Sequence, residues 1–325
     1  MIRRTTFLIF LGYLTLLDGH VAYAEDRDSE AEAVAWLGRM GEALRERNYQ
    51  GIFSYIRGSI FDTVRIVHRV SEDGETERLF NLNGDVRELY RHDDEILCFH
   101  PKAESDSAAG GDFAIEEHSV QIGPFTPAFS DKVLATRDLY NLSMLGEDRI
   151  AGRPAVTLSI TPRFRDRYGY RLWLDQETGL LLQSHLVDRG RVKEIFQFTS
   201  LEIDEALAES ELASAIEGET VSHALALDMN EMAEKPVWRV SWLPDGFRPV
   251  RIKGNRLHFS DGLATFSVFV EKPDAASLPE MTTTLGGTVV ITHRIKQNGS
   301  QVTVVGEVPV QTARRVAESV EPVIY

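Results

Sequence analysis

The sequence predicts an α+β protein with two antiparallel-sheet domains. Short runs in which apolar and polar residues alternate fill residues 51–100, 155–200 and 237–308, and this period of two is typical of strands. Turn signals such as Asp73-Gly74 and Asn298-Gly299 join the runs, and these connections are too short for the helical crossover that parallel strands require. A length of 325 residues corresponds to about two domains.

The first 24 residues have the pattern of a secretory signal peptide. Two arginines precede an eleven-residue apolar run at 7–17, and the small-x-small motif Ala22-Tyr23-Ala24 follows it. The run is shorter than the roughly 20 residues that cross a bilayer. An uncleaved anchor is the alternative, which Asp18 disfavours because a charge ends the run there. We expect cleavage after Ala24 and export of the mature chain.

The first domain is expected over residues 25–218. Leu37 and Leu44 belong to an amphipathic stripe at helical spacing, and Ser130 is a suitable N-cap for a later helix. We therefore predict helices at 29–47, 130–145 and 204–216.

Nine strands are predicted in this domain. The polar segment 101–129, which contains several Gly and Pro, separates the first five from the last four. Several strands carry apolar residues on both faces, so the sheet is expected to be covered on both sides or to curl. The predicted strands are 51–57, 63–70, 76–82, 85–91, 95–100, 155–161, 169–175, 180–187 and 192–200.

A polar linker is predicted at 219–235 and a second, smaller domain at 236–325. A helix is predicted at 310–320, after Pro309, because Ala313 and Val316 begin an apolar face there. The predicted strands of this domain are 237–243, 248–253, 256–259, 264–271, 288–296 and 301–308.

Charge and motifs exclude several classes of function. The chain has 35 Lys and Arg against 50 Asp and Glu, and a net charge of −15 argues against binding nucleic acid. One cysteine excludes an intrachain disulfide framework. Neither a hydrolase elbow, a zinc-protease helix, a phosphate-binding loop nor a dinucleotide fingerprint occurs. The sequence therefore predicts no enzyme, no catalytic residues and no cofactor.

Cys98 and His100 are the nearest approach to a metal site, because they share one face of a predicted strand. A metal usually needs three or four protein ligands, and no further set presents itself. We therefore predict no metal. Whether Cys98 is a buried thiol or forms an intermolecular disulfide stays open.

The apolar surplus of the first sheet predicts an enclosure for an apolar ligand. Curled antiparallel sheets with helices against one side can hold such a ligand, and ordinary core packing is the alternative for each residue. The residues expected to line the enclosure are Phe53, Ile66, Leu79, Leu97, Phe99, Trp173 and Phe196.

Residues 163–171 depart from the acidic background, with four arginines and three aromatics in nine positions. Arginine binds carboxylates and phosphates in a bidentate manner, so this segment suits an anionic partner. The alternative is a hairpin end whose arginines lie in water or pair with neighbouring acids. The candidates are Arg163, Arg165, Arg167, Tyr168 and Arg171.

The mature chain resembles the RseB/MucB family in motifs that follow one another in order. In the first domain they are 48–55 (NYQGIFSY), 146–153 (GEDRIAGR), 167–175 (RYGYRLWLD) and 177–181 (ETGLL). In the second domain they are 242–247 (WLPDGF), 260–264 (SDGLA), 267–271 (SVFVE) and 304–309 (VVGEVP).

This resemblance implies a fold and a function. It implies a periplasmic negative regulator of the envelope-stress sigma factor, sigma-E or AlgU. Such a regulator binds the periplasmic part of a transmembrane anti-sigma factor of the RseA/MucA type and hinders its proteolysis. The first domain is implied to be a half-open barrel similar to LolA and LolB. It would sense acyl chains of lipoproteins or lipopolysaccharide, and the second domain would contribute much of the anti-sigma contact. A periplasmic lipid or lipoprotein carrier of the LolA type is the alternative, and the oligomeric state, a homo-oligomer included, stays open.

Overall fold

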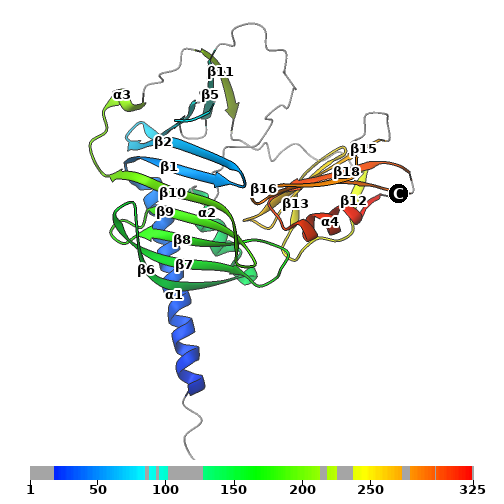
Figure 1. Ribbon diagram of the computed structural model, residues 1–325, viewed down its shortest axis with the longest axis horizontal. Coiled ribbons are helices and arrows are strands. Elements are labelled where there is room, and N and C mark those ends of the chain that lie inside the picture. Colours follow the sequence, from blue (N-terminus) through cyan, green and yellow to red (C-terminus); the bar gives the residue numbers. More distant parts are fainter. Residues whose placement is uncertain are drawn as a thin grey trace, which may run out of the picture.

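The computed structural model describes residues 18–84, 88–92, 95–101, 127–212, 218–224, 237–272, 279–296 and 298–323. Figure 1 shows a larger unit, built from a curled sheet and the long helix α1, beside a smaller unit that carries α4. Within the described residues, no helix combines the length and the apolar character needed to cross a membrane.

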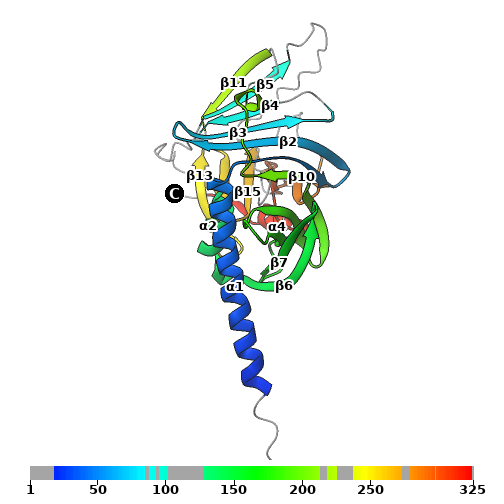
Figure 2. The same ribbon diagram turned by 90° about the vertical axis from the view of Figure 1, so that its left-hand side faces the viewer.

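The larger unit is one antiparallel sheet of eleven strands among the described residues. Their order is β11-β5-β4-β3-β2-β1-β10-β9-β8-β7-β6. Because β11 and β6 are the two edges, the sheet curls without closing, as Figure 2 shows, and the prediction of a half-open antiparallel barrel is confirmed. The strands are β1 (Tyr49–Arg57), β2 (Ile60–Ser71), β3 (Gly74–Asn81), β4 (Glu88–His92), β5 (Glu95–Pro101), β6 (Tyr140–Ile150), β7 (Arg153–Pro162), β8 (Gly169–Asp175), β9 (Leu181–Asp188), β10 (Arg191–Ile203) and β11 (Gly218–Ala224).

Two helices, α1 (Asp18–Glu46) and α2 (Pro127–Ala135), cover the inner face of this sheet. Leu37, Met40 and Leu44 of α1 are fully buried at helical spacing and belong to the same core as Phe53 of β1. The N-terminal part of α1 projects beyond the sheet (Figures 1 and 2). Cleavage after Ala24 would shorten this projection, and it stays a prediction.

The smaller unit has a six-stranded sheet in the order β13-β14-β15-β18-β17-β16, counted over the described residues. Helix α4 (Val310–Glu318) buries Ala313, Val316 and Ala317 against it. The unit also contains a separate two-stranded sheet. The strands are β12 (Trp238–Val240), β13 (Arg248–Lys253), β14 (Arg256–Ser260), β15 (Thr265–Glu271), β16 (Met281–Leu285), β17 (Thr288–Arg294), β18 (Gln301–Gly306) and β19 (Val320–Pro322), of which β12 and β19 form the pair.

The prediction of a helix at 130–145 is wrong for the second half of that range. Helix α2 ends at Ala135, a single 3-10 turn, η1 (Arg137–Leu139), follows, and β6 begins at Tyr140. Tyr140 and Leu142 are buried, and the residue between them is exposed. In this segment, pairing with β7 therefore outweighs the local helical pattern of the sequence.

Two further boundaries differ from the expectation. In place of the helix at 204–216, one helical turn, α3 (Glu209–Leu212), is present, and 213–217 lie outside the described residues. The first part of the expected linker forms β11, which pairs with β5. The backbone there finds hydrogen-bond partners at an open sheet edge, which a polar composition does not reveal. Most of segment 101–129 and residues 225–236 lie outside the described part.

Candidate functional site: the contact between the two domains

The two domains meet through two groups of side chains. One group surrounds Arg167 in the connection between β7 and β8, and we call it the arginine contact. The other surrounds Gly286 and Gly287 at the turn between β16 and β17, and we call it the glycine contact. Both join residues that are far apart in the sequence, and both bury polar groups.

The arginine contact is an ion pair between the domains. Arg167 Nη1 donates to Asp261 Oδ2 at 2.7 Å, and both side chains are fully buried. Arg167 Nε donates to Asp166 Oδ1 at 2.8 Å, and Nη2 donates to the carbonyl of Asp245. The guanidinium also lies 5.4 Å from the ring centre of Phe247. Burial opposes the positive charge, but hydrogen bonding to Asp166 and the charge of Asp261 outweigh it and raise the pKa of Arg167.

Hydrogen bonds to the backbone extend the arginine contact on both sides. Tyr168 Oη donates to the carbonyl of Val308 at 2.9 Å, and Thr312 Oγ1 donates to the carbonyl of Asp166 at 2.9 Å. Asp261 Oδ1 in turn accepts the backbone N–H of Ala264 at 2.7 Å. The guanidinium, the carboxylate and the surrounding backbone therefore satisfy one another, as buried charges require.

The glycine contact depends on the absence of a side chain. The backbone N–H of Gly287 donates to Glu194 Oε1 at 2.7 Å, and Tyr55 Oη donates to Glu194 Oε2. A Cβ on Gly287 would overlap Leu186 Cδ2, and one on Gly286 would lie 2.5 Å from Arg57 Cγ. Gly286 also has a φ of +59°, which favours glycine. The turn can therefore approach the first sheet this closely only with glycine at both positions.

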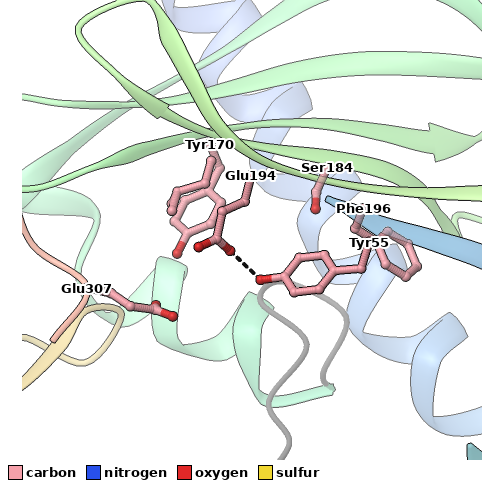
Figure 3. Close-up of a pocket in the computed structure, with 7 residues that line it drawn as sticks. Tyr55, Tyr170, Ser184, Glu194, Phe196 and Glu307 are labelled. Atoms are coloured by element: carbon pink, nitrogen blue, oxygen red, sulfur yellow. Dashed lines mark hydrogen bonds between the residues drawn. The ribbon is translucent and has the colours of Figure 1, made fainter. Parts of the chain in front are cut away.

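A hollow lies beside the glycine contact, lined by Tyr55, Tyr170, Ser184, Leu186, Glu194, Phe196 and Glu307. Figure 3 shows Glu194 and Glu307 on two sides of it, with the Tyr170 hydroxyl directed toward the space between them. Glu194 comes from the first domain and Glu307 from the second. Burial and the neighbouring Glu194 carboxylate raise the pKa of Glu307 to about 7. Burial, followed by the Glu194 charge, also raises the pKa of Tyr55.

The residues predicted to line a lipid enclosure divide between two faces of the sheet. Phe53, Ile66, Leu79 and Phe196 lie buried in the core beneath α1 and α2, and the rings of Phe53 and Phe196 are 4.9 Å apart. Trp173 lies on the opposite face, where it packs with Ala155 and Leu182 and its Nε1–H donates to Asp148 Oδ2 at 2.9 Å. The side chains of Leu97, Cys98 and Phe99 are outside the described part.

The residues predicted to contact an anionic partner also divide. Arg163, Arg165 and Arg171 are exposed, whereas Arg167 and Tyr168 are buried in the arginine contact. Sequence reasoning did not identify Asp261, Glu194, Glu307 or the Gly-Gly turn. Gly286-Gly287 was an available signal for a tight hairpin turn, because Gly-Gly is one of the pairs that such turns favour. Among the described residues, no group of three or more side chains could hold a metal ion.

Comparisons with known proteins give one consistent result. Residues 32–216 match the MucB/RseB N-terminal domain and residues 232–321 the MucB/RseB C-terminal domain. The chain is 39% identical to the sigma factor AlgU regulatory protein MucB of Pseudomonas aeruginosa, with 98% of each chain covered. It is 31% identical to the sigma-E factor regulatory protein RseB of Haemophilus influenzae, with 95% of this chain and 96% of that protein covered.

Solved structures agree with the sequence matches. The structure of the Pseudomonas aeruginosa MucA/MucB complex superposes with a TM-score of 0.73 at 36% identity, covering 90% of this chain and 100% of that one. The crystal structure of MucB superposes with a TM-score of 0.61 at 35% identity, covering 90% of this chain and 98% of that one. Both domains and their order are therefore shared with these relatives.

Proposed function

The chain belongs to the MucB/RseB family, and from this premise we propose that it regulates an envelope-stress sigma factor by binding the periplasmic part of a transmembrane anti-sigma factor. The observation that carries the proposal is the match of both domains to MucB as solved in complex with MucA. The bound chain would cover a protease-sensitive segment of the anti-sigma factor. The predicted signal peptide supports a periplasmic location, in which the mature chain begins at Glu25.

The exposed arginines of the first domain supply charge for such a contact. Arg163, Arg165 and Arg171 project from the turn between β7 and β8 and from β8 itself. Because these arginines are exposed and can meet carboxylates from another chain, we propose that they contact acidic side chains of the partner. Arg167 and Tyr168 would act indirectly, by fixing this turn against the second domain.

An acyl chain is proposed as the releasing signal, entering the core beneath α1 and α2. The rings of Phe53 and Phe196 form the apolar floor of that core. Since these side chains are packed, the lipid has to displace part of the helical cover. The signal works only through unequal affinity of the lipid for the free and the partner-bound conformation.

Calorimetric titration tests the binding and the signal together. The mature chain 25–325 is titrated with the periplasmic segment of its anti-sigma factor, with and without a synthetic diacylated lipopeptide. We expect saturable binding that the lipopeptide weakens. Absence of binding, together with transfer of the lipopeptide to acceptor vesicles, would instead support a lipid carrier.

Fluorescence quenching tests where the acyl chain lies. Trp36 of α1 packs against the main core, and Trp173 lies on the opposite face of the sheet. A lipopeptide with brominated acyl chains should therefore quench Trp36. Trp36→Phe should remove most of the quenching, and the matched control Trp173→Phe should retain it. Equal loss in both variants, or loss only in Trp173→Phe, would contradict this position.

A further inference from the structure

The two glutamates beside the Gly-Gly turn come from different domains and share one hollow. Glu194 lies on β10 and is only 6% exposed, and Glu307 follows β18 in the second domain. Two carboxylates close together in a buried site repel each other when both are ionised, and the site is more stable when one of them holds a proton. In this contact the repulsion acts between the domains.

The other groups around the hollow do not neutralise two negative charges. Among the described residues, Arg57 of β1 is the cation that acts on Glu307, and its buried Nε has no hydrogen-bond partner there. Tyr55 of β1 and Tyr168 and Tyr170 of β8 face the same carboxylates, and burial raises the pKa of each, so all three are neutral. One positive charge therefore faces two carboxylates.

The remaining charges nearby pair with each other. Asp188 and Arg189, in the turn between β9 and β10, both act on Tyr168, and Arg189 Nε donates to Asp188 Oδ1 at 3.1 Å. They leave the charge of the hollow almost unchanged. With Glu307 protonated, Glu194 and Arg57 balance, and with Glu307 ionised the hollow carries one excess negative charge.

We propose that the glycine contact is a pH-dependent latch, which holds the two domains together when Glu307 is protonated and loosens when Glu194 and Glu307 are both ionised. The arginine contact stays closed throughout, so the domains remain joined at one place while the other opens. The inference concerns this chain alone and does not depend on the identity of its partner.

The direction of the pH dependence follows from proton linkage. The pKa of Glu307 is about 7 in the closed contact, against an ordinary value of 4.5. Between these two pH values the closed form therefore keeps a proton that the open form has lost. The latch is therefore strongest below about pH 5 and weakens as pH rises through about 7. Between pH 5.5 and pH 8 the ratio of closed to open form should fall by up to about 30-fold.

Hydrogen exchange at the Gly287 amide reports the latch directly, because this N–H donates to Glu194. Exchange is measured from pH 5.5 to pH 8 and corrected for the intrinsic pH dependence of amide exchange. We expect the protection of Gly287 to fall by about 3- to 30-fold as pH rises. The Ala264 amide, bound to Asp261 in the arginine contact, is the internal reference and should keep constant protection.

Two variants separate the latch from a general loss of structure. Glu307→Gln keeps a neutral side chain of the same size, so Gly287 should stay protected at pH 8 and lose its pH dependence. The matched control is Glu318→Gln, an exposed carboxylate on α4, which should behave as the unmodified chain does. Constant Gly287 protection in the unmodified chain, or an unchanged pH response in Glu307→Gln, would overturn the proposal.

Discussion

The arginine contact and the glycine contact join the same two domains but differ in how their charges are satisfied. In the first, a buried guanidinium meets the carboxylates of Asp166 and Asp261 and a backbone carbonyl. In the second, Glu194 accepts two hydrogen bonds while Glu307 faces it across the hollow. Carboxylates that are hydrogen-bonded to a guanidinium hold their charges in place, whereas two carboxylates that face each other can respond to the pH by binding a proton.

Burial alone therefore does not decide how an interface residue affects stability. Arg167 and Glu194 are both almost fully buried. Removing the charge of Asp261 takes from Arg167 its fully buried carboxylate partner, whereas removing a charge from the glycine contact relieves repulsion. The predicted effects of substitution therefore differ in size and, for Glu307, in sign.

The largest effect is expected for Asp261→Asn. The variant keeps an oxygen for the Ala264 amide but removes the fully buried one of the two carboxylates that pair with Arg167, at a cost of about 3–5 kcal/mol in the free energy of unfolding. Urea denaturation followed by circular dichroism measures this loss. Arg163→Gln, an exposed arginine of the same turn, is the control and should change stability by less than about 0.5 kcal/mol. Equal values for the two variants would remove the distinction between buried and exposed arginines.

A smaller effect is expected for Gly287→Ala. The new methyl group would overlap Leu186 Cδ2, and such overpacking costs about 1–3 kcal/mol. Gly38→Ala is the matched control, since a Cβ there meets nothing within 4 Å in helix α1, and it should stabilise the chain by about 0.5–1 kcal/mol.

A double-mutant cycle sharpens this second prediction. Leu186→Ala removes the side-chain atom that the Gly287→Ala methyl group would meet. The double variant should therefore be more stable than the sum of the two single losses predicts. Strict additivity would show that the turn does not press against Leu186.

The smallest effect is expected for Tyr168→Phe. It removes only the hydrogen bond to the Val308 carbonyl, and the loss should be about 0.5–1.5 kcal/mol. The same denaturation experiment applies. A loss as large as that of Asp261→Asn would mean that the hydroxyl, and not the ion pair, holds the arginine contact.

Much of the fold could be predicted from local pattern, and its errors have a common cause. Hairpin turns such as Asp73-Gly74 mark where β2 and β3 meet, so these strands are found from neighbouring residues alone. Strand β11 depends on β5, a partner distant in the sequence, and its own composition does not distinguish it from a linker. Strand β6 pairs with β7, the next strand along the chain, but its own composition favours a helix. Propensity is outweighed there by pairing.

The candidate site was less accessible to sequence reasoning. Arg167 is a candidate because it lies in an arginine-rich segment, but its partner Asp261 is 94 residues away. Nothing in the spacing of Glu194 and Glu307 relates the two, because they meet only after both domains have folded. The pattern indicated which residues carry charge, and the contact between the domains determines what each charge does.

The most direct test of the proposed regulation is the rate at which the anti-sigma factor is cleaved. Its periplasmic segment is incubated with the protease that cuts it, in the presence of increasing amounts of the mature chain 25–325. We predict that the rate falls to a plateau near equal concentrations of the two proteins and recovers when a diacylated lipopeptide is added. A cleavage rate that stays constant as the chain is added would contradict it.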